Sequence, residues 1–366
     1  MSRDDFIFQP MLTCIGNKRK LIGIIEDVIL DVKKELKVDK QSKIRILDGF
    51  CGSTVVSRML SYHSEKLYTN DLENYSHIMA RCFLQTPFEE NKQKINKHID
   101  AMNKLAEEGP YVEGIIANNY APKDTKNILE GERCFYTREN ALIIDTLRKY
   151  IEDNVEEELK HYCLAPLLVK ASIHTNTAGV FKGFYKKNGI GCFGGAGENA
   201  LSRITGKIKL DHIVWNGCRA NCLKGDINKV LKEFKKPLDV IYFDPPYNQH
   251  PYGSNYFMLN LIIDNKMPES ISKVSGIPVD WNKSSYNKKN EATKAMKELL
   301  EKGLEKAKFL MISYNNEGII DKDTWNSLLK DYTIKVYEID YSTFKGSRNL
   351  KDRSDKVVEI IYLVSK

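Results

Sequence analysis

The stretch 240–249, VIYFDPPYNQ, decides the fold of this chain. Its first four residues are β-branched or aromatic, and such a short apolar run predicts a buried strand. The strand must end at the two prolines, because proline lacks the N–H group that a sheet ladder requires. In open α/β sheets ligands bind where the strands end. Asp244 and Tyr247 therefore mark the expected site.

Asp244, Pro245, Pro246 and Tyr247 together offer what an aromatic amine needs in order to react as a nucleophile. The lone pair of such an amine is delocalised into its ring until both hydrogens are held. The Asp244 carboxylate is one acceptor, and the Pro245 carbonyl, oriented by two successive prolines, is another. Tyr247 offers a ring on which an extruded base can stack. The alternative is a rigid turn, since Asp and Pro favour turns for local reasons.

Residues 45–60, RILDGFCGSTVVSRML, predict a strand, a glycine-containing turn and a helix. Gly52 lets the backbone approach a ligand closely. Asp48, at the tip of the strand, is within reach of the ammonium of a methionine group, as in S-adenosylmethionine (SAM). No second glycine follows Gly52, so the dinucleotide fingerprint is incomplete and a nicotinamide cofactor is disfavoured.

Two further segments place acidic residues at strand ends. In KLYTNDLE, 66–73, Asp71 lies about twenty residues beyond the glycine turn, the spacing at which an acidic residue meets ribose hydroxyls. In CLKGDINKVLKEF, 222–234, Asp226 is expected to accept from the adenine amine of SAM, with Ile227 packed on the ring. For both Asp71 and Asp226 the alternative is an ordinary helix N-cap.

With these four segments in this order, the chain resembles the Dam-type, class-alpha adenine-N6 DNA methyltransferases. The segment MLTCIGNKRKLIGII, 11–25, resembles the opening motif of that family. The resemblance implies a Rossmann-like sheet, SAM as cofactor, no metal, and Asp244 and Tyr247 as catalytic. The chain departs from the family pattern at Ser53 and Thr54, where the family usually has a third small residue in its glycine turn. The implied or expected SAM contacts are Gly16, Asn17, Lys18, Asp48, Phe50, Gly52, Asp71, Asp226 and Ile227.

The order of patterns predicts an α/β fold with an insertion. Residues 1–85 and 206–366 are expected to form the SAM-binding domain, and 86–205 an inserted, partly helical target-recognition region. Two late strands, TIKVYEIDY and KVVEIIYLV, predict an antiparallel C-terminal hairpin. A basic linker with Arg348, Lys351 and Arg353 separates them and is expected to face a duplex.

Candidate nucleic-acid contacts come from two polar loops. A glycine-rich loop with interleaved basic and aromatic residues suits phosphate contacts, although a solvated surface loop fits equally well. The loop after Tyr247 carries polar and aromatic side chains close to the expected site. The candidates are Asn176, Lys182, Lys186, Lys187, Arg203, His250, Tyr252, Asn255 and Tyr256.

The composition fits this picture without proving it. The formal net charge of +7 over 366 residues is compatible with a polyanionic partner. The eight cysteines form no CxxC pair, which disfavours a zinc site and indicates reduced thiols. No signal core or membrane-length apolar run occurs, so a cytoplasmic protein with no membrane partner is expected.

The expected function is transfer of methyl from SAM to adenine N6 in a short sequence of double-stranded DNA. The base would be flipped into the pocket at Asp244, and a cognate restriction endonuclease would be the partner. One alternative is the same chemistry on RNA, or on a cytosine or glutamine amine. The other is a non-catalytic nucleic-acid-binding module that only senses SAM.

Overall fold

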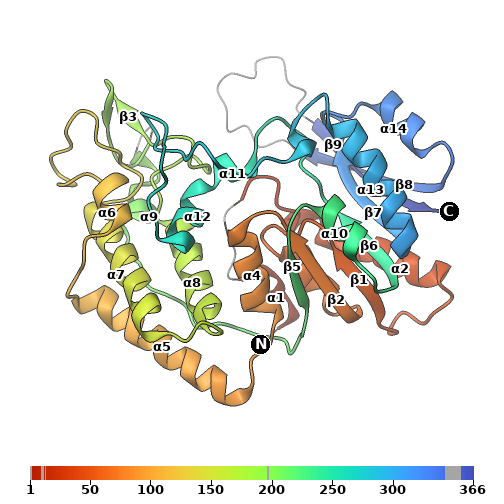
Figure 1. Cartoon of the computed structure of the whole chain (residues 1–366), viewed down its shortest axis with the longest axis horizontal. Helices are drawn as coiled ribbons and strands as arrows, with labels where there is room; N and C mark the ends of the chain where they lie inside the picture. The colour runs from red at the N-terminus through yellow and green to blue at the C-terminus, as the bar shows by residue number, and fades with distance from the viewer. Residues whose placement is uncertain (1, 10–11, 13, 196–197, 343–355) are drawn as a thin grey trace.

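The computed structural model of the chain describes residues 2–9, 12, 14–195, 198–342 and 356–366 (Figure 1). One sheet has seven strands, in the order β5-β2-β1-β6-β7-β9-β8. These strands are β1 (Ile44–Asp48), β2 (Ser64–Asp71), β5 (Asn221–Lys224), β6 (Leu238–Phe243), β7 (Ala307–Asn315), β8 (Thr333–Ser342) and β9 (Lys356–Ser365). The first five in this order are parallel, and β9 runs antiparallel to β7 and β8. The predicted α/β class, with its Rossmann-like sheet and antiparallel C-terminal hairpin, is confirmed.

The sheet lies between two layers of helices. Every residue of β6 is buried, as its unbroken apolar sequence predicts. Val240 and Tyr242 enter the core formed with α2 (Ile22–Glu35) and α3 (Val55–Leu60). Ile241 and Phe243 enter the core formed with α10 (Ile227–Glu233), α13 (Ala292–Lys306) and α14 (Lys322–Leu329). The strand order reverses between β1 and β6, and a ligand crevice is expected at such a reversal.

A third core holds a group of helices together to the left of the sheet in Figure 1. These helices are α4 (Asn74–Leu84), α5 (Glu89–Glu108), α6 (Ile115–Asn119), α7 (Arg138–Asn154), α8 (Lys160–Ile173) and α12 (Phe257–Asp264). In α5, Ile95, Ile99, Met102 and Ala106 recur every three or four residues and are buried. This spacing gives the helix one apolar face, and its lysines and glutamates cover the rest.

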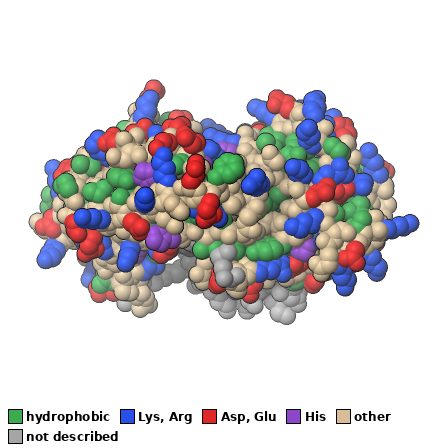
Figure 2. Space-filling model, turned by 90° about the horizontal axis from the view of Figure 1, so that it is seen from below, with side chains coloured by type: hydrophobic (Ala, Val, Ile, Leu, Met, Phe, Trp, Pro, Cys, Tyr) green, Lys and Arg blue, Asp and Glu red, His purple; other side chains and the backbone are tan. Residues whose placement is uncertain are grey.

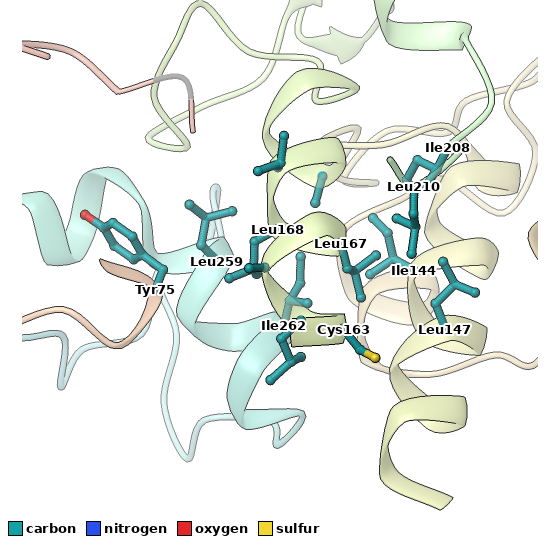
Figure 3. Close-up of a cluster of buried hydrophobic side chains, with 14 of the residues drawn as sticks. Tyr75, Ile144, Leu147, Cys163, Leu167, Leu168, Ile208, Leu210, Leu259 and Ile262 are labelled. Carbon is teal, nitrogen blue, oxygen red and sulfur yellow. The ribbon is translucent and has the colours of Figure 1, made fainter. Parts of the chain in front are cut away.

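In this third core α8 lies between α12 and α7, and Figure 3 shows Leu168 beside Leu259 on one side of α8 and Leu167 toward Ile144 on the other. Tyr75 of α4 joins them from the side of the sheet. Two of these helices, α4 and α12, lie outside residues 86–205, one before that stretch and one after it. The helical group is therefore built from residues of both the predicted insertion and the predicted SAM-binding domain. The inserted region 86–205 stays a prediction.

Apolar residues at helical spacing, among them Leu142, Ile143 and Leu147, predict helices over 140–151 and 156–171, and these correspond to α7 and α8. The remaining elements are α1 (Arg3–Phe8), η1 (Arg19–Leu21), β3 (Lys186–Lys187), β4 (Ile190–Gly191), α9 (Leu201–Thr205), α11 (Tyr252–Asn255) and η3 (Ser285–Asn287). Within the described part of the chain, no helix is both long enough and apolar enough to span a membrane.

Candidate active site

A cavity lies at the carboxyl ends of β1, β2, β5 and β6, where the strand order predicts it. The loop before η1 and the loop around η3 complete its wall. All the predicted SAM contacts except Asp48 line this cavity, namely Gly16, Asn17, Lys18, Phe50, Gly52, Asp71, Asp226 and Ile227. Segments from four distant parts of the sequence therefore meet at one place.

Asp48 lies beneath the cavity and organises the glycine turn. It is fully buried, and its carboxylate accepts hydrogen bonds from Ser57 Oγ at 2.5 Å and from the Phe50 backbone N–H at 3.3 Å. Burial raises the pKa of Asp48 to about 7. The turn also requires glycine, because a Cβ at Gly49 would lie 2.7 Å from the Phe243 ring. In this structure Asp48 therefore supports the turn and does not line the cavity.

Asp71 and Asp226 combine a local role with a place in the cavity wall. Asp71 accepts from the backbone N–H of Gly52 at 2.8 Å and of Glu73 at 2.9 Å, so β2 and the glycine turn fix its carboxylate. Asp226 caps α10 by accepting from two backbone N–H groups at 3.1 and 3.2 Å. Asp226 is thus the helix N-cap that the sequence allowed. The side chains of Asp71 and Asp226 both border the cavity.

An apolar slot forms the part of the cavity next to Asp226. Phe50 and Tyr286 meet edge to face with their centroids 5.4 Å apart, and Ile227 lies in the same wall. The Tyr286 hydroxyl donates to Asn228 Oδ1 at 2.6 Å. Sequence reasoning missed Tyr286, because an isolated tyrosine in a polar loop gives no sign of what it will contact. Apolar and aromatic side chains of this kind can pack against an aromatic ring of a ligand.

Asp244 follows β6 directly and pairs with Lys18, whose Nζ lies 2.8 Å from Asp244 Oδ1. Lys18 is only 3% exposed, and it also lies 4.0 Å from Glu359 Oε2. Burial raises the pKa of Asp244, and Lys18 opposes that rise. Burial lowers the pKa of Lys18, but Asp244, Tyr247 and Glu359 reverse this and raise it. In this structure Lys18 therefore contacts Asp244, the first residue of the sequence Asp244-Pro245-Pro246-Tyr247 (the DPPY motif).

The other residues of the DPPY motif divide between the cavity and its surroundings. Pro246 lines the cavity, while Pro245 and Tyr247 are outside its lining. The Tyr247 ring lies edge-on to Tyr314 at 6.0 Å, and Lys18 Nζ is 5.5 Å from its centroid. The Tyr247 carbonyl accepts from the Ile319 backbone N–H at 2.8 Å, which fixes the segment.

Tyr252 and Tyr256, which the sequence suggested as DNA contacts, hold the loop before η1. Tyr256 is 1% exposed, and its hydroxyl accepts from the Ile15 backbone N–H at 2.7 Å. The Tyr252 hydroxyl donates to the Ile15 carbonyl at 3.0 Å, and the two rings stack. Gly16 has a φ of +78°, and a Cβ there would lie 3.1 Å from the Tyr252 hydroxyl. The two tyrosines thus shape the cavity wall.

Three other candidate DNA contacts are at least partly buried within the protein. Asn176 is fully buried; its amide donates to the carbonyls of Cys134 and Cys192, each at 2.8 Å, and accepts from the Gly194 N–H. Arg203 donates to backbone carbonyls at the end of α8, and Asn255 is 7% exposed. The expectation that Asn176 faces DNA is therefore corrected: its buried amide orders the glycine-rich loop.

The remaining candidates face solvent. Lys182, Lys186, Lys187 and His250 are exposed, and the hairpin of β3 and β4 projects at the upper left of Figure 1. On the underside, Figure 2 shows acidic and basic side chains interspersed over the described part of the surface. Arg348, Lys351 and Arg353 of the basic linker lie outside the described residues.

Glu73 is a further residue of the cavity that the sequence analysis missed. Its carboxylate accepts from Asn260 at 2.8 Å and Asn282 at 3.1 Å, and burial raises its pKa to about 7. Both partners lie more than 180 positions along the chain, so no local pattern could have indicated the contact. Among the residues described, no group of three or more His, Cys, Asp or Glu side chains is arranged to hold a metal ion.

The comparisons with known proteins point in one direction. A sequence model of the D12 class N6 adenine-specific DNA methyltransferases matches residues 15–328. The type II methyltransferase M.CviAII of Paramecium bursaria Chlorella virus 1 is 28% identical over 321 residues, which is 87% of each chain. M.NlaIII of Neisseria lactamica is 26% identical, with 96% of this chain and 98% of that one covered. M.FokI of Planomicrobium okeanokoites is 27% identical over 96% of this chain and 52% of its own length.

Proposed function

Because the chain belongs to the D12 class of N6 adenine-specific DNA methyltransferases, we propose that its cavity binds SAM and that Asp244 and Pro245 hold the target amine. The observation that carries this proposal is the position of Asp244. It follows the central strand β6 and lines the same cavity as Asn17, Gly52 and Asp71. Methyl donor and acceptor would therefore meet at one strand end.

The residues of the cavity fit SAM. Asp71 and Asp226 give the wall an acidic character that suits a ligand with an ammonium and a sulfonium. The slot of Phe50, Ile227 and Tyr286 suits an adenine ring. Asn70 also borders the cavity, and its Oδ1 is buried with no hydrogen-bond partner among the described residues. A buried acceptor of this kind is satisfied when a ligand donates to it.

The main role of the protein in this reaction is to orient the reacting groups. SAM supplies a methyl group that its sulfonium activates. The Asp244 carboxylate accepts a hydrogen bond from one hydrogen of the adenine N6 amine and the Pro245 carbonyl accepts one from the other, so the nitrogen lone pair is directed at the methyl group. The proton that the methylated nitrogen loses passes to the Asp244 carboxylate and from there to solvent. Lys18, paired with Asp244, favours the ionised carboxylate, which can only accept. Tyr247 provides the ring against which the extruded base stacks.

We further propose that the enzyme is the modification part of a restriction-modification system acting on double-stranded DNA. The relatives named type II methyltransferases, one of which matches over nearly its whole length, support this role. Lys182, Lys186 and Lys187 are the proposed phosphate contacts. A DNA substrate also makes the cytoplasm, where bacterial DNA lies, the proposed place of action.

The test is transfer of labelled methyl from SAM to methylation-free genomic DNA and, in parallel, to total RNA. Label in N6-methyldeoxyadenosine is expected for the wild type and none for Asp244→Ala, with SAM binding within about threefold of wild type. Asp323→Ala, at an exposed carboxylate of α14, is the control and should stay active. Label in RNA alone would move the substrate to RNA, and SAM binding without any transfer would support a sensing module.

A further inference from the structure

Glu359 is a buried carboxylate at the site that the proposed reaction does not use. It lies in β9, where it pairs in register with Asn315 of β7 and Ile339 of β8. Because β9 runs antiparallel to β7, its first residues reach the edge of the sheet where β6 and β7 end. The residue is 9% exposed, so its charge is largely removed from water.

Among the described residues, the surroundings of Glu359 compensate its charge incompletely. Its Oε2 has no hydrogen-bond partner among the described residues, and Lys18 Nζ lies 4.0 Å away. Burial raises the pKa of Glu359, Lys18 lowers it, and Asp244 raises it. A buried carboxylate with an oxygen that accepts no hydrogen bond costs free energy, so stability does not explain its presence. A role in the reaction would explain it.

Lys18 connects Glu359 to Asp244. Its buried ammonium is 2.8 Å from Asp244 Oδ1, 3.4 Å from the Gly16 carbonyl and 4.0 Å from Glu359 Oε2. An ammonium held by a single carboxylate is free to shift between its two oxygens. A second anion on Lys18 restricts that movement, and it also helps to keep the ammonium charged.

We infer that Glu359 is a positioning residue for methyl transfer: acting through Lys18, it holds the ammonium at one oxygen of Asp244 and leaves the other oxygen for the adenine amine. The inference rests on the proposed function of Asp244. Glu359 touches neither substrate nor methyl donor in this scheme. Its effect is on the orientation of Asp244, to which the rate of an in-line reaction is sensitive.

The first test is Glu359→Gln, which keeps the size of the side chain and removes its charge. We expect kcat to fall by about tenfold or more, while KM for SAM and for DNA stays within about threefold. The melting temperature should be unchanged or higher, because a costly buried charge is gone. Glu338→Gln, at an exposed glutamate of β8, is the matched control and should leave kcat and KM unchanged.

The second test is a double-mutant cycle with Lys18→Met. If Glu359 acts through Lys18, Glu359→Gln has no further effect on kcat once Lys18 is replaced. Glu359→Asp, which retains the charge, should recover part of the activity that Glu359→Gln removes. Both results would separate positioning from a general effect on folding.

Three outcomes overturn the inference. The first is a kcat for Glu359→Gln equal to that of the Glu338→Gln control, and the second is fully additive effects of Lys18→Met and Glu359→Gln on kcat. A fall in kcat that follows a lower melting temperature would also overturn it. Failure of the proposed function looks different, because the wild type would transfer no methyl or Asp244→Ala would retain full activity. In that case the inference falls with it.

Discussion

The pairing of Lys18 with Asp244 makes a pH effect the most direct prediction at the scale of single residues. Burial raises the pKa of Asp244 and Lys18 lowers it. The ionised carboxylate only accepts hydrogen bonds, whereas the protonated acid carries an O–H donor and is a weaker acceptor for the amine, so activity is expected above this pKa and is lost as the pH falls through it. In Lys18→Met the ammonium that lowers the pKa of Asp244 is gone, so this pKa rises further. The acid limb of the pH–activity profile is therefore expected to move to higher pH.

The measurement is the pH dependence of single-turnover methyl transfer for the wild type and Lys18→Met. Lys34→Met, at an exposed lysine of α2, is the control. An acid limb at the same pH in all three proteins would contradict the assignment of that limb to Asp244.

Tyr286 gives a second prediction at this scale, because its ring and its hydroxyl have separate roles. The ring meets Phe50, and the hydroxyl bonds Asn228. Tyr286→Ala should weaken SAM binding by about tenfold, since an aromatic contact contributes about 0.5–1.5 kcal/mol beyond its buried area. Tyr286→Phe should bind SAM almost as the wild type does but unfold more easily, because Asn228 loses a partner. Calorimetric titration measures the SAM affinity of the two variants, and thermal unfolding measures their stability. Equal SAM affinities for Tyr286→Ala and Tyr286→Phe would show that the Tyr286 ring is not part of the SAM site.

At the scale of elements, the loop before η1 depends on glycine. Gly16 has a φ of +78°, and a Cβ there would lie 3.1 Å from the Tyr252 hydroxyl. Gly16→Ala should therefore lower the free energy of unfolding by about 1–2 kcal/mol and weaken SAM binding, because the loop must shift. Gly23→Ala in α2 is the matched control, since a Cβ there meets nothing within 4 Å.

Gly23→Ala should be neutral or stabilising by up to about 1 kcal/mol, as alanine favours a helix. Denaturant unfolding and SAM titration measure both variants. If Gly16→Ala binds SAM as tightly as Gly23→Ala does, the loop is not part of the SAM site.

The elements themselves were largely predictable, whereas several contacts between them were not. The apolar run 240–243 and the spacing of Leu147 and its neighbours predicted β6 and α7, because periodicity is a local property. The partners of Glu73 and Glu359 belong to other elements far along the chain, so no local pattern marks them. Asn176 was misjudged for the same reason: a polar residue in a glycine-rich loop looks exposed until its buried partners are known.

At the scale of the whole molecule, the exposed lysines at and near the β3 hairpin are the proposed phosphate contacts. Replacing Lys182, Lys186 and Lys187 by alanine should make DNA binding weaker and less dependent on salt. The slope of log K against log salt should fall by about 0.9 for each phosphate that the protein no longer neutralises. SAM binding should not change, because none of the three lines the cavity.

The matched control replaces three exposed lysines of α5, at the bottom of Figure 1, namely Lys94, Lys97 and Lys104. It removes the same charge from another face, so a general electrostatic effect would change both triple variants alike. Fluorescence anisotropy on a duplex over a range of salt concentrations distinguishes the two. An equal change in slope would remove the hairpin from the proposed DNA surface.

The pairing of β1 with β6 also has a consequence for the order of events during folding. Ile46 lies beside Val240, and the Arg45 backbone N–H donates to Asp239 at 3.0 Å, across 194 positions of the chain. The helices of the third core, except α12, lie within this long interval. Closing so long a loop while it is unfolded is costly in entropy, and contacts between distant residues form slowly. We therefore expect α5, α7 and α8 to gain protection from hydrogen exchange early in refolding, and the centre of the sheet, with the cavity at its edge, to be completed last.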